Sequence, residues 1–216
     1  MRSCFKIMLM LSLALGLVGC NLPAPSPAIT PLAVRGSPTP VMPLDTPATE
    51  QPTPAPTASV PADWQTYMDQ QYGFTFRYPK EGQIFSQENG YARINGLPFA
   101  PGTNLVEKYL EVNVAENANP CSSPLTQGYA PGYIQSQQVT INGLAWVIEG
   151  GEDAGAGQIH TWTAYSTVKG NACVSLSFIL HSTNPGMYST PPPLFDEAAE
   201  SAVFADIVFT FVWLNP

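Results

Sequence analysis

Histidine and cysteine are the residue types in this chain that most often carry chemistry, and it has only two histidines and four cysteines. His160 alternates with Trp162 in a stretch of strand-like composition, so both side chains are expected on one side of a strand. An imidazole beside an indole could line a pocket for a small ligand. The commoner alternative is a histidine that serves only as a sheet residue with satisfied polar atoms.

Other arrangements that carry chemistry are poorly supported by the spacing. Two cysteines and two distant histidines lack the close spacing of a zinc site. The chain has serines, histidines and aspartates from which a Ser-His-Asp triad could be chosen, but no G-x-S-x-G motif supports one. We therefore predict no catalytic residues, no metal ligands and no bound cofactor.

The most unusual segment is Glu149–Gly157, which combines four glycines with three carboxylates. Glycine-rich loops can cradle phosphate, but these carboxylates would repel it and no helix is predicted to follow. The regular ligand spacing of a calcium loop is also missing. The segment is predicted to be a flexible, solvated connection between two hairpins.

The first nineteen residues have the layout of an export signal, with Arg2 and Lys6 before an apolar run from Ile7 to Leu17. The run is too short for a retained transmembrane helix, which needs roughly 20 apolar residues. Leu17-Val18-Gly19-Cys20 resembles the lipobox of bacterial lipoproteins. The resemblance implies a signal peptide over 1–19, a diacylglyceryl group on the Cys20 thiol and cleavage just before Cys20. An ordinary cleaved signal is the alternative.

A lipid on Cys20 would make the membrane one partner of this chain. The expected location is extracytoplasmic, with the anchor in the cell membrane or the outer membrane. One acyl chain alone would hold only marginally, and the resemblance implies several. Asn21 is not an aspartate, so the inner-membrane retention signal of some double-membraned bacteria is absent.

The same assignment leaves Cys121 and Cys173 as the thiols of the exported part, since Cys4 belongs to the signal and Cys20 would carry lipid. Two cysteines left in an oxidising compartment most simply pair with each other. Closing a loop of this length would stabilise the fold by about 4 kcal/mol on the chain-entropy model. We predict a Cys121–Cys173 disulfide, with a metal site as the weaker alternative.

Proline divides the remaining chain, because 12 of its 23 prolines fall between Pro23 and Pro61. Proline supports neither a helix nor a strand ladder, so 20–61 is predicted to be a disordered tether. Residues 62–216 are predicted to form a single domain. This part has five basic and 14 acidic residues. Nucleic acid is therefore excluded as a partner, since no basic stripe exists to bind it.

Strand patterns dominate the domain. Aromatic residues alternate from Tyr72 to Tyr78, which predicts a half-buried strand, and Asn142-Gly143 is a strong hairpin signal. Glu116–Tyr133 shows no such period and is predicted to be a long loop anchored by the disulfide. Strands are expected at 72–79, 91–94, 108–115, 138–141, 144–149, 159–168, 172–180 and 208–213. A helix is expected at 194–206, because alanine and glutamate replace β-branched residues there.

Two stretches resemble PsbP-like domains: the opening strand from Tyr72 to Pro79, and the helix-to-strand ending Phe204–Phe211. That resemblance implies an α+β fold, a central antiparallel sheet flanked by helices in an α/β/α sandwich. It implies little chemistry, because many bacterial members are exported lipoproteins of unassigned role. No basic patch for docking to a photosystem is visible, so that role is not carried over.

Three functions are compatible with these features. The favoured one is a lipid-anchored extracytoplasmic module without catalysis, which holds a partner protein or a small ligand at the cell envelope. The alternatives are an envelope hydrolase whose site assembles only in three dimensions, and a structural envelope component. A concave pocket that joins His160 to a carboxylate and a serine would favour the hydrolase.

Overall fold

The computed structural model describes residues 60–130 and 132–214. The predicted signal peptide, the predicted lipid-attachment residue Cys20 and nearly all of the predicted tether lie outside the described residues. The described part contains ten strands, one α-helix and two short 3-10 helices, η1 (Pro124–Thr126) and η2 (Pro185–Met187). None of its helices combines the length and the apolar character that a membrane crossing requires.

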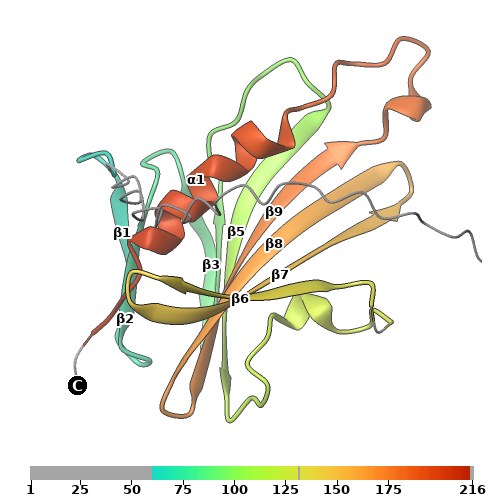
Figure 1. Ribbon diagram of the computed structural model, residues 1–216. Helices are drawn as coiled ribbons and strands as arrows, with labels where there is room; N and C mark the ends of the chain where they lie inside the picture. Colours follow the sequence, from blue (N-terminus) through green and yellow to red (C-terminus); the bar gives the residue numbers. More distant parts are fainter. Residues whose placement is uncertain (1–59, 131, 215–216) are drawn as a thin grey trace, which may run out of the picture. The chain divides into compact units, whose positions relative to one another are not determined.

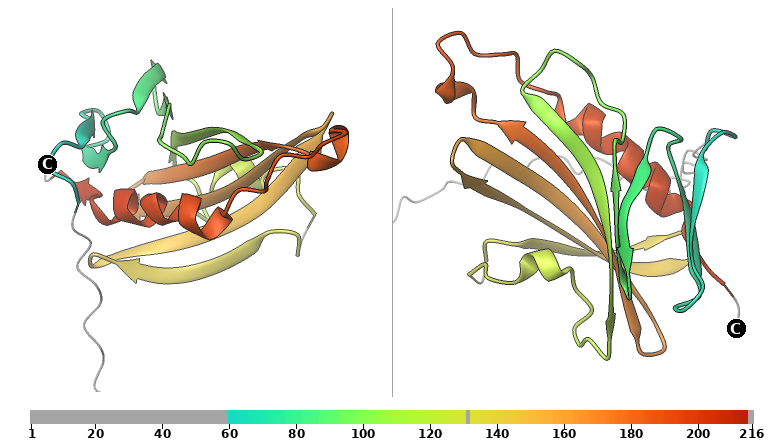
Figure 2. Two further views of the ribbon diagram at one scale, coloured as in Figure 1. Left: turned by 90° about the horizontal axis from the view of Figure 1, so that it is seen from above. Right: turned by 180° about the vertical axis from the view of Figure 1, so that it is seen from behind.

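Seven strands form one antiparallel sheet in the order β3-β4-β5-β9-β8-β7-β6 (Figure 1). Four of them are twelve residues long, and the sheet is strongly twisted (Figure 2). The strands are β3 (Gln83–Glu88), β4 (Tyr91–Asn95), β5 (Leu105–Glu116), β6 (Gln135–Ile141), β7 (Leu144–Gly155), β8 (Gln158–Lys169) and β9 (Ala172–Thr183).

A smaller antiparallel sheet has the order β1-β2-β10, formed by β1 (Gln65–Asp69), β2 (Phe74–Tyr78) and β10 (Val212–Trp213). In β2 the side chains of Phe74, Phe76 and Tyr78 are buried, and the residues between them are half-buried. This is the alternation that the sequence predicted. It turns the aromatic rings of β2 into the main core, where Phe74 stacks on Phe211 with ring centroids 5.5 Å apart.

The single α-helix, α1 (Glu197–Phe209), begins at Asp196, whose side chain accepts a hydrogen bond from the amide of Ala199. It packs on the seven-stranded sheet through Phe204, which stacks on Phe178 with centroids 4.4 Å apart. A buried ion pair joins Lys108 on β5 to Glu200 on α1, with Nζ and Oε2 3.0 Å apart. Burial lowers the pKa of Lys108, and the contact with Glu200 opposes that shift.

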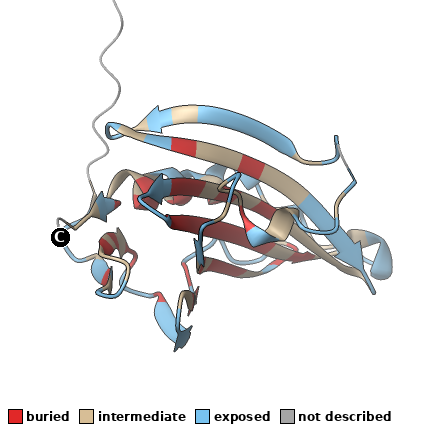
Figure 3. Cartoon of the chain, turned by 90° about the horizontal axis from the view of Figure 1, so that it is seen from below, coloured by how far each residue is buried: buried red, intermediate tan, exposed pale blue. Residues whose placement is uncertain are grey.

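The two faces of the large sheet have different covers, and β9 shows this most directly. Phe178 points to α1 and the main core, whereas the preceding residue, Ser177, contacts Ser123 on the opposite face. Successive strand residues point to opposite faces, so Ser123 lies on the face away from α1. This second face is covered by residues 117–130, called the covering loop below. Figure 3 shows the buried residues concentrated in the central strands.

The predicted α+β sandwich flanked by helices is wrong. The protein is mostly β, with two antiparallel sheets and one helix in the described residues. The second face of the large sheet is covered by the covering loop, in which only the short 3-10 helix η1 is regular; its prolines lack the amide hydrogens that an α-helix requires. Beyond the predicted strands there are also β1 and β3, and α1 extends through Val208 and Phe209, which were expected in a strand.

The hairpin turn at Asn142-Gly143 is confirmed. It joins β6 to β7, and both turn residues have positive φ, 50° and 76°. This is the backbone that a two-residue hairpin requires and that asparagine and glycine tolerate best.

Candidate functional site

The start of the covering loop is tied to the second face by one covalent bond and two hydrogen bonds. Cys121 forms the predicted disulfide with Cys173 on β9. The amide of Ser123 donates to Oε2 of Glu149 on β7 (2.7 Å), and the hydroxyls of Ser123 and Ser177 lie 2.9 Å apart. The start of the loop is thereby fixed to two strands of the sheet.

Glu149 is an acceptor that the sequence did not reveal. Its carboxylate is buried, and this burial raises its pKa, while the hydrogen bond from Ser123 acts in the opposite direction. The segment from Glu149 was predicted to be a flexible connection, and that prediction is wrong. It continues β7 to Gly155, and the turn to β8 is made by Ala156 and Gly157, both at positive φ.

The glycine at position 151 has a packing role in this strand. A Cβ atom added there would lie 2.7 Å from Cζ2 of Trp162 on the neighbouring strand β8. Only a residue without a side chain lets the indole lie so close to the β7 backbone. Gly151, one of the glycines that suggested a flexible loop, instead allows the Trp162 indole to approach the β7 backbone closely.

Trp162 forms the floor of a hollow of about 420 Å³ on this face. Tyr109 of β5 and Ile179 of β9 are buried beside it. Tyr129 of the covering loop closes one side, since its hydroxyl is 3.4 Å from the indole Nε1 of Trp162 and donates to the carbonyl oxygen of Glu152. The hollow is thus built by the sheet and the fixed loop together.

Its rim is polar and carries negative charge. Glu111, Asp153 and His160 line it, with Gln127 from the loop, and no lysine, arginine, serine, threonine or cysteine does. Such a rim favours a neutral or positively charged occupant over an anion.

A row of titratable residues crosses the sheet at this rim. Asp153, His160, His181 and Glu107 occupy directly opposed positions on β7, β8, β9 and β5. The imidazole rings of His160 and His181 stack with centroids 4.3 Å apart. Burial lowers the pKa of His160, the charge of His181 adds to this, and Asp153 and Glu107 oppose it.

His181 and Glu107 have further polar partners. Nε2 of His181 lies 2.7 Å from Oε1 of Gln158, and Nδ1 lies 3.6 Å from Oε2 of Glu107. The other oxygen of Glu107 accepts from Arg93 at 3.0 Å, and the Arg93 guanidinium lies 3.8 Å above the ring of Tyr109. Arg93 is therefore already paired and stacked beside the hollow.

The structure brings His160 and Trp162 together, on one face and around one hollow. Ligand binding by these two residues stays a prediction. Sequence reasoning missed His181, Asp153, Glu149 and the covering-loop residues. Continuing the alternation of the last long strand from Ser177 would have placed His181 on the same face as the serines. Within residues 60–130 and 132–214, no group of three or more His, Cys, Asp or Glu side chains could hold a metal ion.

No protein-family model matches the sequence, and no curated protein matches it significantly. Several solved structures are similar at low identity. A protein from Bacteroides thetaiotaomicron has a TM-score of 0.47 and 13% identity, over 71% of this chain and 49% of that protein. This chain therefore spans about half the length of the Bacteroides protein.

Two further proteins are similar over nearly the whole of their compared chains. The Ran-binding protein Mog1p of Saccharomyces cerevisiae has a TM-score of 0.45 and 10% identity, over 70% of this chain and 96% of Mog1p. The cyanobacterial PsbP protein of Synechocystis has a TM-score of 0.32 and 12% identity, over 76% of this chain and 99% of that protein. A PsbP structure is thus among those that this chain resembles. At these TM-scores the similarities support no conclusion about function.

Proposed function

We propose that this chain is a non-catalytic, extracytoplasmic binding module, held at a membrane by lipid on Cys20, which takes a small ligand in the hollow above Trp162. The single observation that carries the ligand site is the hollow itself. Distant segments, the covering loop and four strands, converge on one aromatic floor with a polar rim. Small-ligand sites typically combine an apolar floor with a few polar groups in this way.

The same hollow argues against the hydrolase alternative. The hydrolase hypothesis required a pocket that joins His160 to both a carboxylate and a serine. Asp153 lies at the hollow with His160, but no serine lines it. In the part of the chain that the structure describes, the imidazole nitrogens of His181 pair with Gln158 and Glu107, and no hydroxyl forms a hydrogen bond with His160. A nucleophile next to a base is the arrangement that hydrolysis of this type needs.

The charge of the rim defines the test. Benzyl alcohol, benzylammonium and benzoate share one ring and differ in charge, so they are suitable probes for titration into the full-length chain, followed by ¹⁵N NMR. We expect the first two to shift the indole resonance of Trp162 saturably, while that of Trp213, in the other sheet, serves as the internal reference. Benzoate should bind at least about tenfold more weakly because of the carboxylate of Asp153.

A matched pair of variants locates the site. Asp153→Asn removes a rim carboxylate and should weaken benzylammonium binding without affecting benzyl alcohol. Glu152→Gln makes the equivalent change one residue away, on the other face of β7, and should leave both unchanged. Equal binding of all three probes, or the absence of a saturable shift at Trp162, would contradict the proposal.

A further inference from the structure

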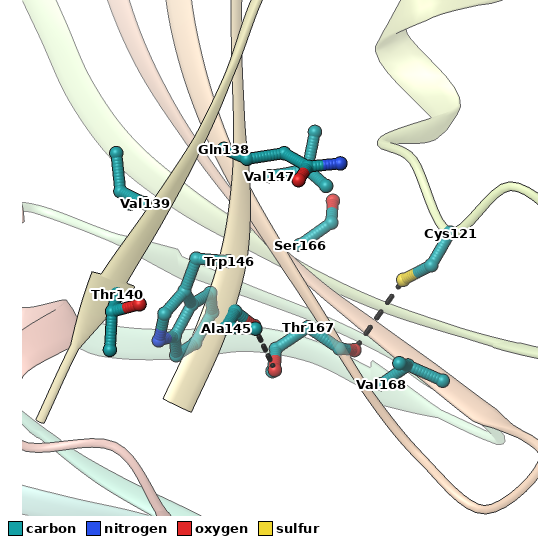
Figure 4. Close-up of a pocket in the computed structure, with 10 residues that line it drawn as sticks. All are labelled: Cys121, Gln138, Val139, Thr140, Ala145, Trp146, Val147, Ser166, Thr167 and Val168. Carbon is teal, nitrogen blue, oxygen red and sulfur yellow. Dashed lines mark hydrogen bonds between the residues drawn. The ribbon is translucent and has the colours of Figure 1, made fainter. Parts of the chain in front are cut away.

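A second hollow, of about 370 Å³, lies beside Cys121 of the covering loop (Figure 4). Strands β6, β7 and β8 supply most of its lining, and Cys121 of the covering loop forms one wall. The Cys121 sulfur lies 3.4 Å from the carbonyl oxygen of Thr167. This is a packing contact, since a disulfide sulfur has no proton to donate. The loop is therefore seated directly against β8 at this point.

The lining differs from that of the hollow above Trp162 because none of its ten residues is charged (Figure 4). Val147 is half-buried, and Val168 exposes 57% of its surface although it lies in a strand. The hollow therefore has an uncharged and partly aliphatic lining, although the domain has 14 acidic residues. It provides no counter-charge for an ion, so an ionic occupant would lose hydration without compensation.

Ser166 supplies the observation that points to a polar contact in this hollow. Its side chain is buried, with 1% of the residue exposed, and its hydroxyl oxygen has no hydrogen-bond partner. Figure 4 shows Ser166 among the lining residues, and strand register places Val147 between it and Gln138. A buried hydroxyl without a partner is unfavourable unless another molecule satisfies it.

We propose that this hollow, bounded by β6, β7, β8 and Cys121, is a second binding site that takes a neutral, compact aliphatic group carrying one hydrogen-bonding atom. The aliphatic part packs on Val147 and Val168, and the polar atom pairs with the hydroxyl of Ser166. The alternative is that water alone satisfies Ser166, in which case no organic molecule would bind saturably. The site is independent of the proposed ligand hollow at Trp162.

The test uses three probes with one shape and different charges: tert-butanol, tert-butylammonium and pivalate. Each is titrated into the full-length chain, and the methyl resonances of Val147 and Val168 are followed by ¹³C NMR. We expect saturable shifts with tert-butanol and at least about tenfold weaker binding of both ions, because the hollow offers them no counter-charge.

Variants then test separately the contribution of the space in the hollow and that of the Ser166 hydroxyl. Ala145→Phe places a ring in the hollow at an exposed position and should abolish the shifts. Ser166→Ala keeps the space but removes the hydroxyl, and should weaken tert-butanol binding by about two- to tenfold. Ser136→Ala, at an exposed position of β6 outside the hollow, is the matched control and should bind like the wild type.

Three results would overturn the site: no saturable shift at Val147 and Val168, an unchanged affinity in Ala145→Phe, or equal binding of the ions. Unchanged affinity in Ser166→Ala, with a thermal midpoint that shows the variant is folded, would overturn the role given to the hydroxyl. Because the valine resonances report only on this hollow, the outcome does not depend on the Trp162 titration.

Discussion

His160 and His181 stack across β8 and β9 with ring centroids 4.3 Å apart, and each has an acidic residue on its outer side in the same row of the sheet. Burial lowers the pKa of His160, and the charge of the neighbouring His181 adds to this effect. Asp153 on β7 and Glu107 on β5 partly offset this effect. Protonation of His160 therefore changes the charge at the rim of the Trp162 hollow as the pH falls.

The stability of the protein should fall in mild acid through His160. Its pKa in the folded protein is lowered from 6.5. Below pH about 6.5 the unfolded chain binds a proton that the folded chain does not, so acid favours unfolding. We expect the free energy of unfolding of the wild type, relative to His160→Gln, to decrease between pH 7.5 and pH 5. Solvent screening keeps the change below about 1 kcal/mol.

Urea denaturation of both chains at four or five pH values measures this difference. At pH 7.5 the imidazole is neutral in both states, so the difference there serves as the baseline. A difference that stays constant or grows as the pH falls would show that His160 is not depressed in the folded protein.

Reduction of the disulfide should destabilise the protein and release the covering loop. Opening the Cys121–Cys173 bridge, with its sequence separation of 52, costs about 4 kcal/mol on the chain-entropy model. The measurement is guanidinium denaturation with and without reductant, together with hydrogen exchange of the loop amides. The double variant Cys121→Ala/Cys173→Ala should show the same stability and the same loop exchange with and without reductant. Equal stability of the oxidised and reduced wild type would refute the effect.

Gly151→Ala should be destabilising, whereas Gly150→Ala should be mild. The added Cβ at position 151 would meet Trp162 at 2.7 Å, but at position 150 the nearest atom is a carbonyl oxygen at 3.5 Å. Overpacking of this kind typically costs about 1–3 kcal/mol. Thermal unfolding of the two variants gives the comparison, and a blue or red shift of indole fluorescence should accompany only the first. Similar midpoints for both variants would remove the packing role of Gly151.

Cys20→Ala should release the protein from membranes into the medium, because the anchor would lose its attachment point. Mass spectrometry of membrane-extracted wild type should show acylated Cys20. Cys4→Ala, which changes a cysteine within the signal, is the control and should remain membrane-bound. Retention of Cys20→Ala in the membrane fraction would count against lipid anchoring.

Local patterns predicted the strands well, because alternation depends only on neighbours in the chain. The aromatic alternation in β2, the turn at Asn142-Gly143 and the shared face of His160 and Trp162 all belong to this class. The helical flanks were predicted wrongly, since they rested on a family resemblance carried by two short stretches at the ends of the domain.

The remainder of the site depends on pairings between distant segments. His181 meets His160 only through the register of β8 and β9, and Ser123 reaches Glu149 only because the covering loop folds back. The glycines at 150 and 151 misled the interpretation for a related reason. Both lie within β7, and the indole of Trp162, which no neighbour-based pattern places there, lies against Gly151.

The alternation along β9 separates two tasks. Leu176 and Phe178 belong to the main apolar core, whereas Ser175 and Ser177 face the covering loop. The disulfide and the serine contact that hold the covering loop therefore lie on the opposite side of β9 from the aromatic interior under α1. The residues of the covering loop can change in evolution without altering the apolar packing under α1 that stabilises the fold.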